Sequence, residues 1–326
     1  MSKVAVLGAG AWGTALALQA LRAGAVTTLW ARDPARAAAM RAAGENARYL
    51  PGQALPAALG ITADLAAALD GAALALLVVP AQHLRPVLAA LPAKAPPLLV
   101  CAKGVERASL LLPLEVCAEA RPGLALGVLS GPNFAHEVAA GLPAAAVVAS
   151  AAAGPRDLAD RLLATPAFRL YASEDPMGVQ VGGAAKNVVA IAAGVVSGAG
   201  LGENARAALV TRGLAELSRL VVALGGRAET AAGLSGLGDL LLTAAGAGSR
   251  NTSLGLALGR GQGVAEVLAG RHGVTEGVAT APALLARAAR AGVELPICAA
   301  VAALLAGEVT VPEAIAQLLA RPRRGE

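Results

Sequence analysis

The sequence predicts an α/β fold in two parts: a domain of alternating strands and helices over residues 1–175, followed by an all-helical domain over residues 176–326. Short apolar runs recur between helical stretches in the first part. After Asp175-Pro176, long Ala, Leu and Val stretches with glycine breaks dominate, and no convincing strand follows. The composition is 56% hydrophobic but only 2% aromatic, which suits closely packed helices and buried parallel strands. A length of 326 residues is natural for two domains.

The strands of the first domain are expected where apolar residues run without alternation. Such runs indicate strands buried on both faces, as in a parallel sheet covered by helices. A helix is predicted at residues 14–23, and a second opens at Asp33-Pro34, a pair typical of helix N-termini. The predicted strands cover residues 4–7, 27–30, 73–79, 98–102, 125–129 and 144–149, with 168–171 as the strand that would close the sheet.

Composition also argues against several classes of protein. The mean hydropathy of +0.62 raises the question of a membrane protein. Two of the longest uncharged runs, residues 138–155 and 187–202, are mostly Ala, Val and Gly, and neither supplies the roughly 20 strongly apolar residues of a spanning helix. We therefore expect a soluble protein without membrane insertion, and no signal peptide. The few, scattered aromatic residues exclude a stacking platform for single-stranded nucleic acid.

Cysteine usage and charge favour a cytoplasmic protein with a small anionic ligand. The cysteines are Cys101, Cys117 and Cys298, an odd number without close pairing, which fits a reducing compartment. The histidines are His83, His136 and His272, and they show no metal-ligand spacing, so no metal is expected. The net charge of +5 mildly favours anionic ligands, although solvated Arg-rich ends such as residues 321–324 account for it equally well.

A glycine motif follows the first predicted strand and opens the first predicted helix. Gly8-Ala9-Gly10-Ala11-Trp12-Gly13 is a G-x-G-x-x-G, in which Gly8 allows a tight turn, Gly10 lets the backbone approach a pyrophosphate, and Gly13 lets helix and strand pack closely. The N–H groups of the helix N-terminus then face the phosphates. This context predicts a Rossmann-type dinucleotide-binding domain.

The end of the second predicted strand bears on the choice of cofactor. An acidic residue there binds the ribose 2′-hydroxyl of NAD(H), whereas an arginine accommodates the 2′-phosphate of NADP(H). This chain has Arg32 followed by Asp33, and Asp33 is also a candidate N-cap of the next helix. A solvated surface arginine is the alternative for Arg32. We favour NADPH over NADH and retain NADP(H) and NAD(H) as candidate cofactors.

Two lysines are candidates for the chemistry. Lys186 lies in a predicted helix of small residues. Desolvation lowers the pKa of a lysine and a nearby carboxylate raises it, and a lysine tuned in this way can donate a proton to an alkoxide as hydride arrives. Lys103 follows a predicted strand at its carboxyl end, where ligands bind in open α/β sheets. The alternatives are a surface lysine with a packed stem for Lys186 and a solvent-facing loop lysine for Lys103.

Three further segments offer polar contacts to a ligand. The segment 130–135 presents backbone N–H groups after a strand, unless it is only a Gly-Pro turn. Asp239 places a carboxylate in an apolar stretch, unless it is a helix N-cap. The segment 249–252 combines a guanidinium with hydroxyl and amide donors that suit a phosphate, unless it is a polar turn between helices.

In order and spacing, these segments resemble the bacterial NAD(P)-dependent sn-glycerol-3-phosphate dehydrogenase family over nearly the whole chain. The combination of GGAAKN with GLGDLLLT and SRN is specific to this family within its superfamily, whereas the G-x-G-x-x-G is not. The similar runs are GAGAWGTALA from Gly8, LWARDP from Leu29, CAKG from Cys101, SGPNFAHE from Ser130, GVQVGGAAKNVVAIAAG from Gly178, GLSGLGDLLLT from Gly233, GSRN from Gly248 and GVTEG from Gly273.

The resemblance implies an active site in a cleft between the two domains and the reversible reduction of dihydroxyacetone phosphate to sn-glycerol 3-phosphate, which supplies phospholipid synthesis. It implies that Lys186 is the general acid/base, with Asp239 as its orienting carboxylate. Lys103 would contact both substrate and nicotinamide, and the amide of Asn187 would stabilise developing negative charge.

The resemblance also implies two sets of binding residues. Substrate-binding positions are Lys103, Gly131, Asn133, Lys186, Asp239, Ser249, Arg250 and Asn251. Cofactor-binding positions are Gly8, Gly10, Ala11, Trp12, Gly13, Arg32, Lys103, Ala135, Arg250, Val274 and Glu276. Asn133 departs from the Ser or Thr expected there, which puts one substrate contact in doubt, and Glu276 has a surface loop acid as its alternative.

Three alternative functions fit parts of the same pattern. A two-domain dehydrogenase for a small hydroxy acid such as 3-hydroxyisobutyrate would not need the SRN segment for a phosphate. A catalytically silent NADP(H)-binding redox sensor would not need Lys186 together with Asp239. A helical interaction module on a dinucleotide-binding scaffold is supported only by the apolar helices. A homodimer is left open.

Overall fold

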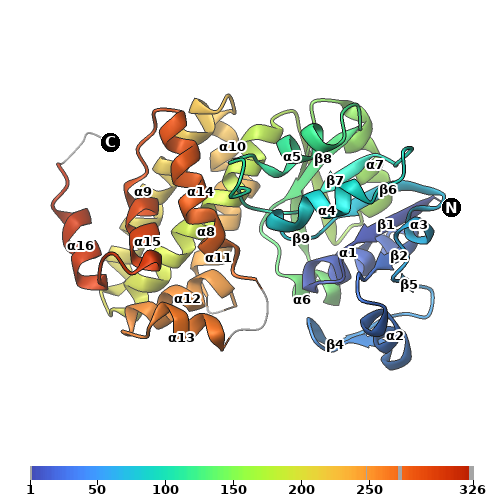
Figure 1. The fold of residues 1–326 in the computed structure, drawn as a ribbon, viewed down its shortest axis with the longest axis horizontal. Helices are drawn as coiled ribbons and strands as arrows, with labels where there is room; N and C mark the ends of the chain where they lie inside the picture. The colour runs from blue at the N-terminus through green and yellow to red at the C-terminus, as the bar shows by residue number, and fades with distance from the viewer. Residues whose placement is uncertain (1, 247, 271–273, 323–326) are drawn as a thin grey trace. The chain divides into compact units, whose positions relative to one another are not determined.

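A computed structural model describes residues 2–246, 248–270 and 274–322. The chain forms two compact units, the first made of Met1–Lys103 and Leu112–Gln180, the second of Gly104–Leu111 and Val181–Glu326. The first unit is α/β and the second is helical, so the predicted fold class is confirmed (Figure 1). The division expected after residue 175 coincides with the start of helix α8 (Pro176–Gly198), and the first unit ends inside this helix.

The first unit is built on an eight-stranded sheet with the strand order β10-β9-β8-β7-β6-β1-β2-β5. In this order β2 lies on one side of β1 and β6 on the other, which makes the carboxyl end of β1 a topological switch point, where open α/β sheets bind ligands. The strands are β1 (Lys3–Leu7), β2 (Val26–Trp30), β5 (Gly60–Thr62), β6 (Ala72–Leu77), β7 (Leu98–Val100), β8 (Leu126–Ser130), β9 (Ala144–Ala149) and β10 (Phe168–Ser173).

The direction of the last two strands corrects the all-parallel expectation. The six strands from β5 to β8 in the sheet order pair in parallel. Strand β9 pairs antiparallel with β8, and β10 is parallel to β9, so these two run against the other six. A continuous apolar run reports burial on both faces of a strand, but it carries no information about strand direction.

Helices cover the sheet (Figure 1). The core of this unit is built mainly from Ala, Val and Leu side chains. Helix α1 contacts both α6 and α7, and α4 packs on α5. The helices of this unit are α1 (Ala11–Arg22), α2 (Pro34–Ala43), α3 (Leu65–Leu69), α4 (Leu84–Ala89), α5 (Pro113–Ala120), α6 (Ala135–Ala140) and α7 (Ala153–Leu163), with a 3-10 turn at Ala81–His83. Helix α1 begins three residues before the predicted start at Thr14, because Gly10 is its N-cap and Gly13 is already helical.

Strand β5 and a short hairpin of the first unit were not predicted. The hairpin pairs β3 (Glu45–Asn46) with β4 (Leu50–Ala54). Strand β4 contains Pro51 and Gly52, residues that are depleted in strands, so its residues do not show the pattern of a strand. The hairpin becomes important below, because Asn46 reaches the glycine motif.

The second unit consists of helices, and no strand occurs among its described residues. A single turn of π-helix, Leu234–Gly238, precedes α11, and such turns are frequent at functional sites. Besides α8, the helices are α9 (Gly202–Ala223), α10 (Ala228–Ala232), α11 (Asp239–Ala244), α12 (Arg250–Gly259), α13 (Val264–Ala269), α14 (Glu276–Arg290), α15 (Pro296–Ala306) and α16 (Val311–Leu319).

Helix α8 is long and apolar enough to pass a length-and-composition test for a membrane span. Its 23 residues contain an 18-residue window of mean hydropathy 1.5, and that window is 100% buried inside the protein, as in a core helix. The uncharged run of residues 187–202 covers only part of this helix, because Lys186 interrupts it. Backbone contact with α12 accounts for two of its glycines, since a Cβ at Gly194 or Gly198 would lie 2.2 Å from a carbonyl oxygen of α12.

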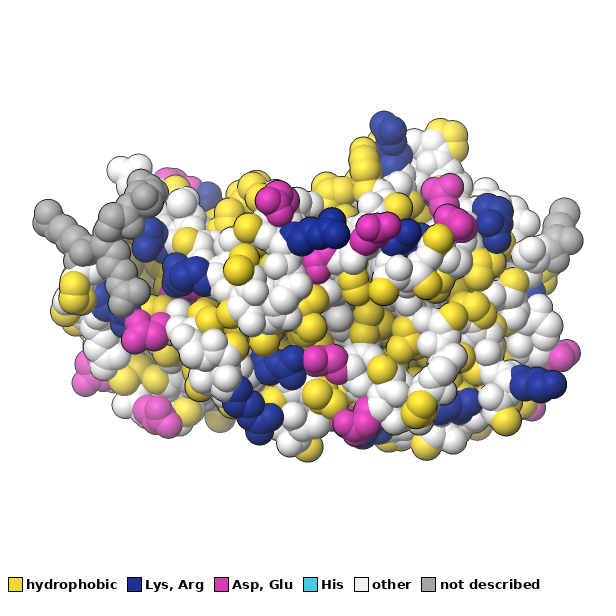
Figure 2. Space-filling model, turned by 90° about the horizontal axis from the view of Figure 1, so that it is seen from above, with side chains coloured by type: hydrophobic (Ala, Val, Ile, Leu, Met, Phe, Trp, Pro, Cys, Tyr) yellow, Lys and Arg dark blue, Asp and Glu magenta, His cyan; other side chains and the backbone are white. Residues whose placement is uncertain are grey.

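Charged side chains are dispersed over the face shown in Figure 2. Lys and Arg alternate there with Asp and Glu among hydrophobic and small residues, rather than forming one basic block. The net charge of +5 is therefore not concentrated into a single basic surface on this face.

Candidate active site

The glycine motif forms a tight turn between β1 and α1 in the first unit. Gly8 has a φ of +126°, and a Cβ there would lie 2.8 Å from the carbonyl oxygen of Val78. A Cβ at Gly13 would lie 1.8 Å from the carbonyl oxygen of Gly8. At Gly10, by contrast, a Cβ would meet no described protein atom within 4 Å. Packing therefore explains two of the glycines, whereas the open space at Gly10 leaves room for a ligand at the N-terminus of α1, so the residues fit a dinucleotide.

Asn46 supports this turn from the β3–β4 hairpin, and sequence analysis missed it. Its side chain is 1% exposed, and Nδ2 donates to the carbonyl oxygen of Ala9 at 3.0 Å and to Oγ1 of Thr14 at 2.8 Å. The hydroxyl of Thr14 in turn donates to the carbonyl oxygen of Gly10 at 2.9 Å. No signal in the chain between the motif and residue 46 indicates this contact, because it depends on the fold.

At the carboxyl end of β2, Arg32 is exposed and Asp33 caps helix α2. The Asp33 carboxylate accepts hydrogen bonds from the backbone N–H groups of Ala35 and Arg36, as the N-cap interpretation predicts. The guanidinium of Arg36 lies 4.3 Å from the ring centroid of Tyr49, and burial lowers its pKa. Arg36 is thus a second cation after β2, besides Arg32, and sequence analysis did not identify it.

Lys103 and the segment from Gly131 follow the neighbouring strands β7 and β8. Nζ of Lys103 donates to the carbonyl oxygen of Gly131 at 3.2 Å, and the lysine is half-buried, which excludes a wholly solvated loop lysine. Nδ2 of Asn133 donates to the carbonyl oxygen of Ala145 at 3.0 Å, and its Oδ1 is a buried atom without a hydrogen-bond partner among the described residues. Ala135 is the first residue of α6. In the first unit, four of the predicted site residues therefore follow strands β7 and β8 at one edge of the sheet: Lys103, Gly131, Asn133 and Ala135.

A buried ion pair lies in the second unit. Nζ of Lys186 lies 2.9 Å from Oδ1 of Asp239, and the two side chains are 10% and 3% exposed. Gly238, not Asp239, is the N-cap of α11, so the interpretation of Asp239 as a helix cap is wrong. Lys186 also donates to Oγ1 of Thr243 at 2.8 Å, and Thr243 donates to Oδ1 of Asp239 at 3.3 Å.

Thr243 is a site residue that sequence analysis missed. It follows Asp239 by one helical turn, so the two side chains share a face of α11. The four-residue spacing could have identified Thr243 as a neighbour of Asp239. A single threonine within Asp239–Ala244 did not, however, point to a catalytic role.

The start of α12 carries the other predicted substrate contacts of this unit. Ser249 is the N-cap and accepts from the N–H of Thr252 at 3.3 Å, so it has a structural task in addition to any contact with ligand. Arg250 is exposed at the first helical position. The amide of Asn251 is buried and donates from Nδ2 to Oδ1 of Asn187 at 2.9 Å.

The remaining predicted cofactor contacts flank the start of α14. Val274 is 44% exposed, and Glu276 is half-buried as the first residue of the helix. Gly273, which opens the GVTEG run, and His272 lie outside the described residues. Among the residues that the structure describes, no group of three or more His, Cys, Asp or Glu side chains is arranged to hold a metal ion.

The three cysteines take no part in this arrangement. All three are buried and free. Burial raises the pKa of the Cys117 thiol to about 12 and those of the Cys101 and Cys298 thiols well above the usual value. Burial therefore disfavours the thiolate form of all three cysteines.

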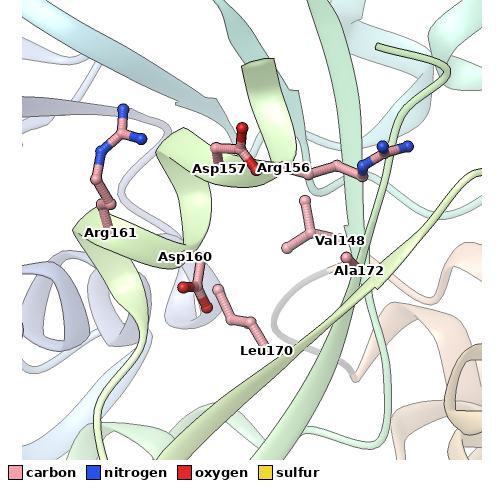
Figure 3. A pocket seen from close by; sticks show the side chains of 7 residues that line it. All are labelled: Val148, Arg156, Asp157, Asp160, Arg161, Leu170 and Ala172. Carbon is pink, nitrogen blue, oxygen red and sulfur yellow. The ribbon is translucent and has the colours of Figure 1, made fainter. Parts of the chain in front are cut away.

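One open groove of the first unit is lined by other residues. It has a volume of about 390 Å³ and contains none of the predicted site residues. Figure 3 shows that α7 supplies its charged side chains. The groove is lined by Val148, Arg156, Asp157, Asp160, Arg161, Leu170 and Ala172.

Comparison with known proteins assigns the chain to a family. The N-terminal model of the NAD-dependent glycerol-3-phosphate dehydrogenases matches residues 3–154, and the C-terminal model matches residues 175–316. The chain belongs to this family. Its resemblance to the family at the level of motifs is thereby confirmed, and as a member it is an oxidoreductase with an NAD(P)-binding, Rossmann-type domain.

Individual members of the family are similar over most of the chain. A glycerol-3-phosphate dehydrogenase of the NAD(P)+ type from Rhodospirillum rubrum is 54% identical over 268 residues, which cover 81% of this chain and 76% of that protein. One from Acidiphilium cryptum is 54% identical over 258 residues, 79% of each. The crystal structure of glycerol-3-phosphate dehydrogenase from Coxiella burnetii superposes with a TM-score of 0.93 at 39% identity, covering 98% of this chain and 99% of that one.

Proposed function

We propose that this chain reduces dihydroxyacetone phosphate to sn-glycerol 3-phosphate, in a reversible reaction that uses NADPH in preference to NADH. The observation that carries the proposal is the buried Lys186–Asp239 pair, completed by Thr243. A buried ammonium group with two fixed acceptors is held in one orientation, as a proton donor requires. Family membership supplies the reaction class.

Lys186 is the proton donor in this proposal. The nicotinamide, when bound, supplies a hydride to the central carbonyl carbon of the substrate. A proton from Nζ of Lys186 moves to the carbonyl oxygen, so the C=O double bond becomes a C–H and an O–H bond. Asp239 and Thr243 orient the amine, and the carboxylate favours the charged form of Lys186 before the transfer.

Other residues of the chain hold the substrate and its developing charge. Lys103 and the amide of Asn187 stabilise negative charge on the carbonyl oxygen. Arg250 anchors the phosphate by a charge-assisted bond. The remaining substrate contacts are assigned to Gly131, Asn133, Ser249 and Asn251.

The cofactor is assigned to the carboxyl edge of the sheet and to the start of α14. Gly8, Gly10 and Gly13 shape the turn on which the pyrophosphate lies, with Ala11 and Trp12 at the helix N-terminus. Arg32 carries the preference for a 2′-phosphate. Lys103, Ala135, Arg250, Val274 and Glu276 are the further cofactor contacts that this proposal assigns.

We place the reaction in the cytoplasm, where its product supplies phospholipid synthesis. The support for this location is the set of three free, buried cysteines, which fits a reducing compartment.

The test is a substrate panel with purified protein and NADPH, followed by loss of NADPH absorbance. Dihydroxyacetone phosphate should be reduced far faster than dihydroxyacetone or methylmalonate semialdehyde, the product of 3-hydroxyisobutyrate oxidation. Faster turnover of the semialdehyde would identify a hydroxy-acid dehydrogenase. Tight NADPH binding without turnover of any compound would identify a redox sensor.

A further inference from the structure

The side chains of Asn187 and Asn251 belong to a buried chain of hydrogen bonds that begins at the backbone of Gly277. The N–H of Gly277 donates to Oδ1 of Asn251 at 3.1 Å. Nδ2 of Asn251 donates to Oδ1 of Asn187 at 2.9 Å. Asn251 and Asn187 are 8% and 3% exposed. The chain thus runs from the first turn of α14, through α12, to the residue after Lys186 on α8.

The polarity of this chain follows from its first member. An asparagine amide can present its oxygen or its nitrogen in a given direction, but a backbone N–H can only donate. Gly277 therefore fixes the Asn251 oxygen toward itself and turns the Asn251 nitrogen toward Asn187. Asn187 must then accept this hydrogen bond through its Oδ1. The Nδ2 of Asn187 points away from Asn251 and makes a long 3.5 Å contact to the Gly183 carbonyl oxygen.

The close approach of α14 to this pair requires glycine at position 277. A Cβ there would lie 2.7 Å from Oδ1 of Asn251, 2.8 Å from Cδ1 of Ile191 and 2.9 Å from the carbonyl oxygen of Asn187. All three distances are shorter than side chains tolerate. The backbone at Gly277 is therefore pressed against the asparagine pair, which keeps its N–H within hydrogen-bond distance.

We propose that Asn251 is a positioning residue, which takes its orientation from the Gly277 N–H and thereby holds the Asn187 amide so that one of its N–H donors is available to the substrate oxygen. The inference rests on the proposed role of Asn187 in stabilising charge there. Because an amide carries two N–H donors, Asn251 keeps one for a direct contact with substrate. The positioning role is thus separate from the phosphate contact that family resemblance assigns to Asn251.

The decisive variant is Asn251→Asp in the full-length enzyme. A carboxylate still accepts from Gly277, but it cannot donate to Asn187, so the Asn187 amide turns to donate toward Asp and presents its oxygen to the substrate. We expect a roughly 10²-fold loss of kcat, the size typical of one lost oxyanion donor. A neutral variant, Asn251→Leu, removes the anchor without burying a charge and should lower kcat in the same direction. NADPH affinity and the melting temperature identify variants that fail to fold.

A double-mutant cycle separates positioning from phosphate binding. If Asn251 acts through Asn187, then adding Asn251→Asp or Asn251→Leu to Asn187→Leu should change kcat by less than about twofold. The loss of kcat caused by the Asn251 variants should be similar for dihydroxyacetone phosphate and for dihydroxyacetone, which has no phosphate, whereas loss of the phosphate contact should raise the KM for dihydroxyacetone phosphate in addition. Arg250→Ala is the matched control, since a phosphate-only effect should be confined to the phosphorylated substrate.

Several outcomes would overturn the inference. Additive losses in the double variants, or a raised KM for dihydroxyacetone phosphate with an unchanged kcat, would leave Asn251 as a phosphate contact alone. An Asn187→Leu variant with the kcat of the wild type would remove Asn187 from the chemistry and the positioning role with it. A wild-type enzyme that does not turn over dihydroxyacetone phosphate would instead refute the proposed function.

Discussion

Nζ of Lys186 lies 2.9 Å from Oδ1 of Asp239, and both groups are almost completely shielded from water although they come from helices far apart in the sequence. Two buried opposite charges stabilise each other only as a pair, and removing one leaves the other uncompensated at a cost of about 3–5 kcal/mol. Substitutions in this pair must therefore be judged on activity and on folding together.

Lys186→Ala should reduce turnover by about 10²–10⁴-fold, the contribution typical of a general acid–base group. NADPH affinity should change little, because the glycine motif is not altered. Steady-state rates with dihydroxyacetone phosphate and NADPH fluorescence titration measure the two effects. To exclude a loss of fold, the neutral pair Lys186→Met with Asp239→Asn should melt at a higher temperature than Lys186→Ala and remain inactive. A Lys186→Ala enzyme with more than about a third of wild-type turnover would contradict the role of proton donor.

Asp239→Asn should be milder in its effect on kcat than Asp239→Ala. The amide keeps the shape of the carboxylate and an oxygen that can accept from Lys186 and Thr243, whereas alanine removes both contacts. The loss for the alanine variant should be about tenfold or more, as expected for a lost charged hydrogen bond of about 1.5–3 kcal/mol. Steady-state kinetics of the two variants provide the comparison. Wild-type kcat in both would leave Asp239 without a catalytic role.

Arg32→Ala should weaken the binding of NADPH and spare that of NADH. Charge-assisted bonds to the 2′-phosphate are each worth about 1.5–3 kcal/mol, so the Kd for NADPH should rise roughly 10–150-fold. NADH lacks this phosphate and serves as the internal control in the same fluorescence titration. Equal weakening of both cofactors would mean that Arg32 acts by packing on the adenosine. In that case the Arg36 guanidinium, 4.3 Å from the Tyr49 ring, would be the next candidate for the phosphate contact.

Asn46→Ala should weaken NADPH binding by roughly tenfold, which corresponds to about 1.4 kcal/mol. The change removes the donor that holds the Ala9 carbonyl oxygen and Thr14 in place, so the glycine motif loses its support. At saturating NADPH, kcat should stay within about twofold of wild type. Fluorescence titration and steady-state kinetics measure these values.

Gln19→Ala is the matched control for Asn46→Ala. Gln19 is a residue of α1 with a buried side-chain amide, like that of Asn46. Its Nε2 donates two hydrogen bonds, to the Leu163 carbonyl oxygen and to Oγ1 of Thr165. Both variants should lower the melting temperature, but only Asn46→Ala should change the Kd for NADPH. An equal rise in Kd for the two would attribute the effect to general loss of stability.

Sequence patterns predicted burial and local geometry better than they predicted contacts. The apolar runs located seven of the sheet's strands, because buried strands need such runs, but they could not show that β9 opposes β8. Similarly, Lys186 and Asp239 stood out as lone charges in apolar segments. Their partner Thr243 and the support of the glycine turn by Asn46 depend on packing between distant segments. The residues next to Thr243 and Asn46 in the sequence do not indicate these contacts.

Arg250→Ala should cost roughly 10–150-fold in kcat/KM for dihydroxyacetone phosphate, from about 1.5–3 kcal/mol for one charged hydrogen bond. Hydride transfer does not itself require a phosphate, so preference for the phosphorylated substrate must come from binding energy at its far end. Arg250 is exposed at the start of α12, held there by the Ser249 cap, and a phosphate anchored to it fixes the carbonyl relative to Lys186. The low activity on free dihydroxyacetone should change far less.

The comparison between the two substrates must be made at saturating NADPH, because Arg250 is also assigned to the cofactor. Steady-state rates with each substrate then separate loss of the phosphate anchor from loss of cofactor binding. If the variant loses activity on both substrates by the same factor, Arg250 serves the cofactor or the fold of α12. The phosphate would then have to be bound elsewhere, and Lys103, half-buried beside Gly131 in the first unit, is the next cation to substitute.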